Sequence, residues 1–141
     1  YILRPKTLFP PEETLMNLAR KIIIIAIVGL FSQFSMAQDN ASAIKEVADI
    51  VASMNHFPSD ADKARLMAIS DDDSLFDGIR AMATAVSNIA HAANADGKAA
   101  MASLQAMDQI PDRPKALAGI IANFNHMASA DAKATLAELF P

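Results

Sequence analysis

Residues 83–104 read ATAVSNIAHAANADGKAAMASL, and this stretch has two relatives in the same chain, one 35 residues before it and one 35 residues after it. The relatives read ADIVASMNHFPSDADKARLMAI at residues 48–69 and AGIIANFNHMASADAKATLAEL at residues 118–139. No gap is needed to align the three copies. The chain therefore contains a threefold internal repeat, which is the sequence signature of a repeat architecture.

Four columns of this repeat carry the same kind of side chain in every copy. The chain has three histidines, and all of them fall in one column. A lysine column, the alanine column directly after it and a basic column near the start of each copy behave in the same way. The columns are His56, His91 and His126; Lys63, Lys98 and Lys133; Ala64, Ala99 and Ala134; and Lys45, Arg80 and Lys115. Coincidence does not explain four such columns together.

Each copy has the pattern of a helical hairpin. Its first half places apolar residues three and four positions apart, which is the spacing of one helix face. After the histidine comes Ser59, Asn94 or Ser129, each a good N-cap, and aspartates follow in the next turn, where they complement the helix dipole. We therefore expect an all-α fold of three tandem hairpins and six helices, as a compact bundle or a short α-solenoid. The compact bundle is favoured for so short a chain, and the equivalent alanines Ala48, Ala83 and Ala118 are expected at helix contacts.

The N-terminal third is predicted to be a targeting segment. Residues 16–37 read MNLARKIIIIAIVGLFSQFSMA, with a basic start, an apolar run at residues 22–31 and small residues at the end. This order is typical of a secretory signal peptide, and we expect cleavage after Ala37. An uncleaved membrane anchor is the alternative, but a bilayer core takes about 20 apolar residues as a helix. Residues 1–15 hold no methionine and are predicted to be untranslated upstream sequence, so residues 38–141 form the expected mature domain.

Composition excludes several classes of function. Cysteine is absent, which rules out disulfides, thiolate metal sites, iron–sulfur clusters and thiol catalysis. Residues 38–141 carry 8 Lys and Arg against 14 Asp and Glu, a formal charge of 8 − 14 = −6, so binding of nucleic acid through phosphate contacts is not expected. We expect an exported protein, periplasmic or secreted, with no stable membrane insertion after signal cleavage.

The histidine column has three interpretations. The first is a structural one, in which each imidazole bonds the last carbonyls of a helix and the neighbouring Asn55 and Asn125 suit left-handed caps. The second is metal ligation by His56, His91 and His126. In an open stack equivalent atoms would lie about 20 Å apart, at roughly 8–10 Å per helix contact, so a shared metal site requires a closed bundle. The third is a binding surface that the histidines form together with Lys63, Lys98 and Lys133.

The acidic segment Asp71–Gly78 suggests a calcium loop that begins at Asp73, but Leu75 then stands at position 3, which needs an oxygen ligand, and Thr84 at position 12, which needs a bidentate glutamate. We expect a linker instead, with Ser74 as the N-cap of the helix that follows.

No enzyme signature is present: the chain has no nucleophile elbow, phosphate-binding glycine loop or His-Glu-x-x-His motif. The sequence therefore favours a helical-repeat interaction module that binds a protein or peptide partner, without a cofactor. The first alternative is a ligand- or metal-binding bundle that uses the three histidines, and the test between them is whether these side chains converge. The second alternative is a self-assembling surface protein, which would expose apolar residues such as Phe140 near the chain end.

Overall fold

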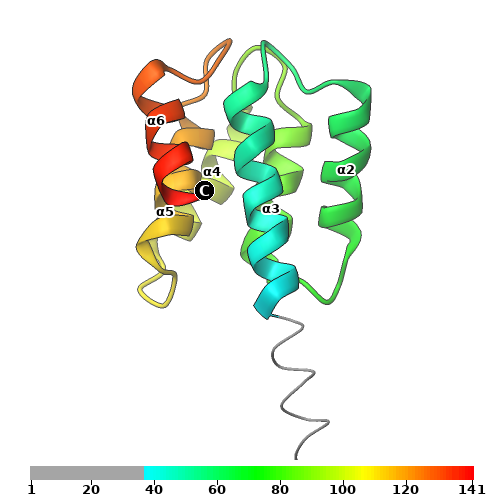
Figure 1. Ribbon diagram of the computed structural model, residues 1–141, viewed down its shortest axis with the longest axis vertical. Helices are drawn as coiled ribbons and strands as arrows, with labels where there is room; N and C mark the ends of the chain where they lie inside the picture. The colour runs from blue at the N-terminus through cyan, green and yellow to red at the C-terminus, as the bar shows by residue number, and fades with distance from the viewer. Residues whose placement is uncertain (1–36) are drawn as a thin grey trace, which may run out of the picture. The chain divides into compact units, whose positions relative to one another are not determined.

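The computed structural model describes residues 37–141, and these residues form six helices and no strand (Figure 1). The first helix covers residues 37–53. The others are α2 (Asp60–Asp71), α3 (Asp77–Ser87), α4 (Ala95–Ala106), α5 (Asp112–Ala122) and α6 (Ala130–Leu139). The predicted all-α fold is confirmed, and a compact bundle agrees with the structure. The predicted upstream segment and nearly all of the predicted signal peptide, residues 1–36, lie outside the described residues.

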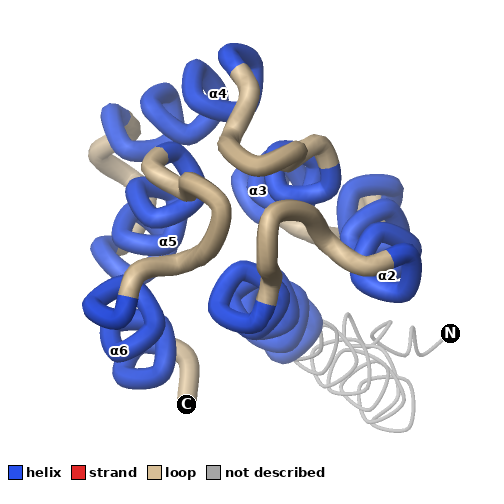
Figure 2. Tube along the Cα trace, turned by 90° about the horizontal axis from the view of Figure 1, so that it is seen from above, coloured by secondary structure: helices blue, strands red, loops and turns tan. Residues whose placement is uncertain are grey.

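The helices form an inner and an outer set. Viewed from above, the first helix, α3 and α5 surround the centre of the bundle, and α2, α4 and α6 lie outside them (Figure 2). Burial follows this division, because most of the core side chains come from the inner set. The outer helices contribute Leu66 and Ile69, Met101 and Leu104, and Leu136. Among the described residues, no helix combines the length and the apolar character that crossing a membrane requires.

Small residues occupy fully buried positions on the inner helices. Ala48, Ala83 and Ala118 occupy one repeat column, one on each inner helix, and their exposed fractions are 1%, 0% and 0%. Larger side chains one turn further along, Val51 and Val86, are also fully buried. The expected place of the alanine column at helix contacts agrees with this burial.

The basic column connects neighbouring repeats. Arg80 Nε, at the start of α3, donates to the carbonyl of Ser70 near the end of α2, at 3.0 Å. Lys45 Nζ, on the first helix, donates to the carbonyl of Phe140 at the end of α6, at 2.9 Å. Ser70 and Phe140 belong to the same repeat column, 70 residues apart. Lys45 therefore bonds to the end of the last repeat in the way that Arg80 bonds to the end of the first repeat. This bond closes the three repeats into a ring.

The outer helices begin at the expected caps. Ser59 Oγ accepts from the backbone N–H of Asp62 at 3.1 Å, and Ser129 Oγ accepts from that of Ala132 at 3.1 Å. Asn94 Oδ1 plays the same part for α4, accepting from Gly97 at 2.8 Å. The predicted N-caps are confirmed, and the aspartates lie in the first turn of each helix.

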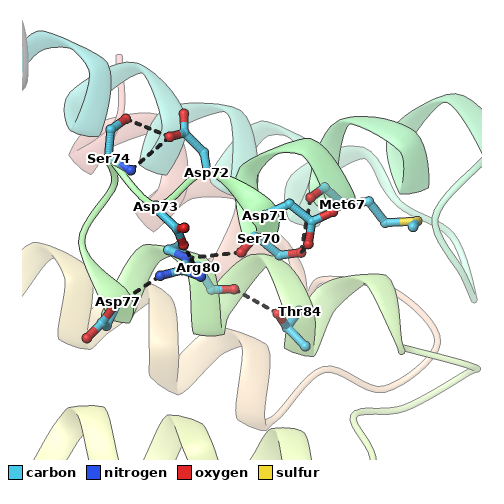
Figure 3. A network of polar contacts seen from close by, with 9 residues as sticks. All are labelled: Met67, Ser70, Asp71, Asp72, Asp73, Ser74, Asp77, Arg80 and Thr84. Atoms are coloured by element: carbon cyan, nitrogen blue, oxygen red, sulfur yellow. Dashed lines mark hydrogen bonds and ion pairs between the residues drawn. The ribbon is translucent and has the colours of Figure 1, made fainter.

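The prediction that Ser74 caps α3 is wrong. The backbone N–H and the hydroxyl of Ser74 both donate to Asp72 Oδ1, at 2.9 and 2.6 Å, and Phe76 is the N-cap without a side-chain bond (Figure 3). The Ser74 hydroxyl, followed by the Ser74 backbone N–H, lowers the pKa of Asp72 below its ordinary value. Helix α3 begins at Asp77, so Ser74 lies two residues before the N-cap position, and its hydroxyl bonds to the nearby Asp72 instead of to the helix.

Arg80 also bonds to the linker between α2 and α3 and to the residues at its two ends. Its guanidinium pairs with Asp73 at 2.9 Å and with Asp77 at 3.4 Å, while its Nε bonds to Ser70 (Figure 3). Both carboxylates are exposed, so each ion pair stabilises the fold little, and the bond to the helix end matters more.

We predict that Ala83→Leu destabilises the protein by about 1–3 kcal/mol, because the site is fully buried and three added carbons overpack the helix contacts. Urea unfolding measures the change. The matched control is Ala102→Leu on the exposed side of α4, which should stay within about 0.5 kcal/mol of wild type. Equal stability of the two variants would contradict close packing at the alanine column.

Candidate functional site

Three loops meet at one end of the bundle, each leading from an inner helix to the next outer helix. They lie together at the top of Figure 1 and turn towards the centre in Figure 2. The backbone N–H of His56 donates to the carbonyl of His126 at 2.5 Å, that of His91 to His56 at 2.7 Å, and that of His126 to His91 at 2.5 Å. These three bonds form a closed cycle, in which each histidine donates to one neighbour and accepts from the other.

Each histidine also takes an unusual backbone conformation. Their φ angles are 66°, 72° and 64°, and they are the only non-glycine residues with positive φ in the described part of the chain. The N–H of Phe57 bonds to the carbonyl of Asn55 at 2.8 Å, and that of Met127 to Asn125 at 2.8 Å, so these two histidines are central residues of γ-turns. Such a conformation costs about 1–3 kcal/mol per residue and persists where the surroundings enforce it. The expectation that Asn55 and Asn125 are the left-handed residues is wrong, because the histidines themselves take that conformation.

The imidazole rings converge. The ring centres of His56 and His126 lie 5.0 Å apart, those of His56 and His91 5.2 Å, and those of His91 and His126 5.7 Å. The ring planes are nearly perpendicular, at 82–89°. His56 Nδ1 lies 2.5 Å from Asn55 Oδ1, and His126 Nδ1 lies 2.6 Å from Asn125 Oδ1. Residues that are 35 positions apart in sequence thus share one small surface.

The interpretation of the histidines as helix caps is wrong. The inner helices end before the histidines, and other side chains bond their last carbonyls. Asn88 Nδ2 donates to Thr84, and Asn123 Nδ2 donates to Gly119, both at 2.9 Å. The three imidazoles contact one another, those of His56 and His126 also contact the preceding asparagines, and none bonds a helix carbonyl in the described part of the chain.

This surface is open to solvent. His56 is half-buried, and His91 and His126 are exposed. Phe57 and Met127, which directly follow two of the histidines, are 58% and 48% exposed. We call the surface formed by the three histidines, Asn55, Asn125, Phe57 and Met127 the histidine apex. Within residues 37–141, no group of three or more His, Asp or Glu side chains is placed so that it could hold a metal ion as the side chains stand.

The lysine column lies on the outer helices, away from the point at which the three histidines meet. Lys63, Lys98 and Lys133 sit early in α2, α4 and α6, and their backbone N–H groups bond to the N-cap residues at 2.8–3.0 Å. Their ammonium groups make no hydrogen bond or ion pair with any described residue. The column thus supplies three separate charges on the outer helices, whereas the histidines form one cluster.

An apolar groove lies at the other end of the inner helices. Its volume is about 780 Å³, and its walls come from the starts of the first helix, α3 and α5 and from the end of α4. Phe76, which is 68% exposed, and Met107, which is 39% exposed, are part of its lining. The histidines follow the opposite ends of the inner helices, and an 11-residue helix is about 16 Å long, so the two sites are separate. We call this feature the apolar groove.

Comparison with protein families, with curated proteins and with solved structures finds no match to this chain. The candidate sites therefore depend on geometry alone. The sequence singles out the histidines through their column but does not reveal the groove, because the residues that line it come from four separate helices. The hydrogen bonds of Asn55 and Asn125 to the imidazoles had one indication in the sequence. In two of the three copies, an asparagine directly precedes the histidine.

We predict that His91→Val destabilises the protein by about 1–3 kcal/mol, because a β-branched residue is strained at a φ of 72°. His91→Asn is the matched control: it also removes the imidazole, but asparagine tolerates positive φ, so the loss should be within about 0.5 kcal/mol. Urea unfolding compares the two variants. If both lose the same stability, the imidazole contacts stabilise the loop and the backbone conformation does not matter.

Proposed function

We propose that this protein is a ligand-binding helical bundle and that the histidine apex is its binding site. The observation that supports the proposal is the convergence of His56, His91 and His126, with ring centres 5.0–5.7 Å apart. A closed ring of repeats does not by itself need a titratable, metal-binding side chain at the position where its loops meet. Strained backbone is found mainly at functional sites, and here it occurs at the three residues that carry the imidazoles.

The proposed activity is binding without catalysis. General-base catalysis needs a nucleophile or a substrate group beside an imidazole that a third group orients. At the histidine apex the imidazoles contact each other and two amide side chains. Three equivalent imidazoles in one cluster are better suited to holding a ligand than to dividing the roles of acid, base and nucleophile.

The proposed place of action is outside the cytoplasm, in the periplasm or the medium. The support is the order of basic, apolar and small residues in residues 16–37, which is typical of a secretory signal peptide. A cysteine-free bundle that relies on packing is compatible with an oxidising compartment.

The apolar groove supports a second candidate function, the binding of a protein or peptide partner. A groove of about 780 Å³ with mainly apolar walls between helices has the form that accepts the apolar face of an amphipathic helix. Self-association through the chain end is less favoured, because Phe140 is 5% exposed and its ring lies under the guanidinium of Arg113, 5.1 Å from the ring centre.

The first test is native mass spectrometry of the protein purified from an exported, untagged source. We expect a mass above that of the polypeptide, and we expect the triple variant His56→Asn, His91→Asn, His126→Asn to lack it. Asparagine tolerates the positive φ, so the fold is retained. Residues 38–141 contain neither Tyr nor Trp, so absorbance near 280 nm would also come from a bound group. An adduct that persists in the triple variant, or its absence from wild type, contradicts binding at the apex.

The groove is tested by a photo-crosslinking residue at position 107, in the lining, compared with the same residue at position 67. Met107 and Met67 are both exposed methionines, 39% and 57%, but Met67 lies on α2 outside the groove. A protein partner should give a discrete cross-linked species from position 107 in the cell envelope or medium, and none from position 67. Equal patterns from the two positions would count against the groove.

A further inference from the structure

We infer that the ligand of the histidine apex is a divalent transition-metal ion, bound by the Nε2 atoms of His56, His91 and His126. The inference rests on the proposed function, because it names the ligand of the same site. Three independent properties of the apex support it: the spacing of the rings, the hydrogen bonds of the second ring nitrogen, and the chemistry of the donor set.

The spacing of the rings fits one metal ion. In a tetrahedral site with metal–nitrogen bonds of about 2.0–2.1 Å, the centres of the imidazole rings lie about 5 Å apart. The three distances observed are 5.0, 5.2 and 5.7 Å. The rings meet edge to face, and their nitrogens do not surround a common point in this structure. Binding an ion therefore requires the side chains to turn, while the backbone cycle keeps the three histidines together.

The asparagines prepare two of the rings for coordination. An amide oxygen can only accept a hydrogen bond, so Nδ1–H of His56 donates to Asn55 Oδ1, and Nδ1–H of His126 donates to Asn125 Oδ1. In the neutral ring the lone pair is then on Nε2, which makes no hydrogen bond within the described residues. Metal-binding histidines almost always donate their other N–H in this way, which fixes the tautomer and the ring orientation.

The donor set selects the class of metal. Three neutral imidazoles suit zinc, copper and nickel, whereas magnesium and calcium prefer carboxylate and carbonyl oxygen. Three protein ligands leave one position of a tetrahedral ion open, as in zinc sites that bind a water or another ligand. The site is open to solvent, because His91 and His126 are exposed, and so are Phe57 and Met127, which directly follow two of the histidines.

The experiment is calorimetric titration of the purified, metal-free protein with ZnCl₂, CuCl₂ and NiCl₂, with MgCl₂ as the negative control. We expect one ion per chain for at least one of the three transition metals, no heat with magnesium, and weaker binding as the solution is acidified, because protons compete for Nε2. His91→Asn should weaken binding at least tenfold, and the triple His→Asn variant should abolish it. The variants keep a residue that tolerates positive φ, and circular dichroism confirms that they fold.

A second variant tests the orienting bond. Asn55→Ala should weaken metal binding by about 10–100-fold while leaving one ion per chain, because it removes the partner of Nδ1. The matched control is Asn88→Ala, whose side chain bonds a helix carbonyl and does not contact an imidazole, and it should stay within twofold of wild type.

The inference is overturned if none of the three transition metals binds, or if binding is unchanged in the triple His→Asn variant. Native mass spectrometry separates this failure from failure of the proposed function. An adduct that is not a metal ion and that depends on the three histidines would retain the apex as a binding site and refute the metal. Absence of any histidine-dependent adduct and of metal binding would refute both.

Discussion

The cycle of three backbone hydrogen bonds at the histidine apex is the constraint on which the rest of the fold depends. In an open stack of repeats, each copy bonds the next and the terminal copies keep unsatisfied loop groups. Here the N–H of His56 donates to the carbonyl of His126 in the last repeat, so the backbone N–H and carbonyl of all three histidines are satisfied. The bond from Lys45 to Phe140 makes the same closure on the side of the bundle. The positive φ of each histidine is the conformational cost of this closure.

Closure changes what a repeat column means. In a solenoid a column becomes a ladder along a surface, whereas near the axis of a closed ring it becomes a cluster. The alanine column of Ala48, Ala83 and Ala118 becomes three fully buried positions, one on each inner helix. The histidine column becomes one group of rings at the axis. Columns far from the axis, such as that of Lys63, Lys98 and Lys133, stay separate on the outer helices, so distance from the axis decides which columns can form a shared site.

Local features of this fold could be predicted from sequence, and features that depend on closure could not. The caps at Ser59, Asn94 and Ser129 were predictable because their bonds reach three residues along the chain. Ser74 was not a cap because α3 begins at Asp77, two residues later than a cap at Ser74 requires, and Ser74 bonds to Asp72 in the turn before the helix. The conformation of the histidines was misjudged, since their φ is set by bonds to residues 35 or 70 positions away. The spacing of 35 residues between histidines is the same in an open stack and in a closed ring. The sequence therefore could not decide whether the three imidazoles converge.

The departures from threefold symmetry show which parts of the apex the backbone needs and which it does not. Ala90 stands where the other copies have Asn55 and Asn125, and Ala92 stands where they have Phe57 and Met127. His91 nevertheless keeps the same φ and the same place in the hydrogen-bond cycle, so the closed backbone requires neither the asparagine nor the large apolar neighbour. The asparagines therefore act on the imidazoles themselves, because each bonds the Nδ1 atom of one ring, whereas His91 has no such partner among the described residues. The site that we propose thus combines two rings that an amide orients with a third ring that no amide in the described part of the chain orients.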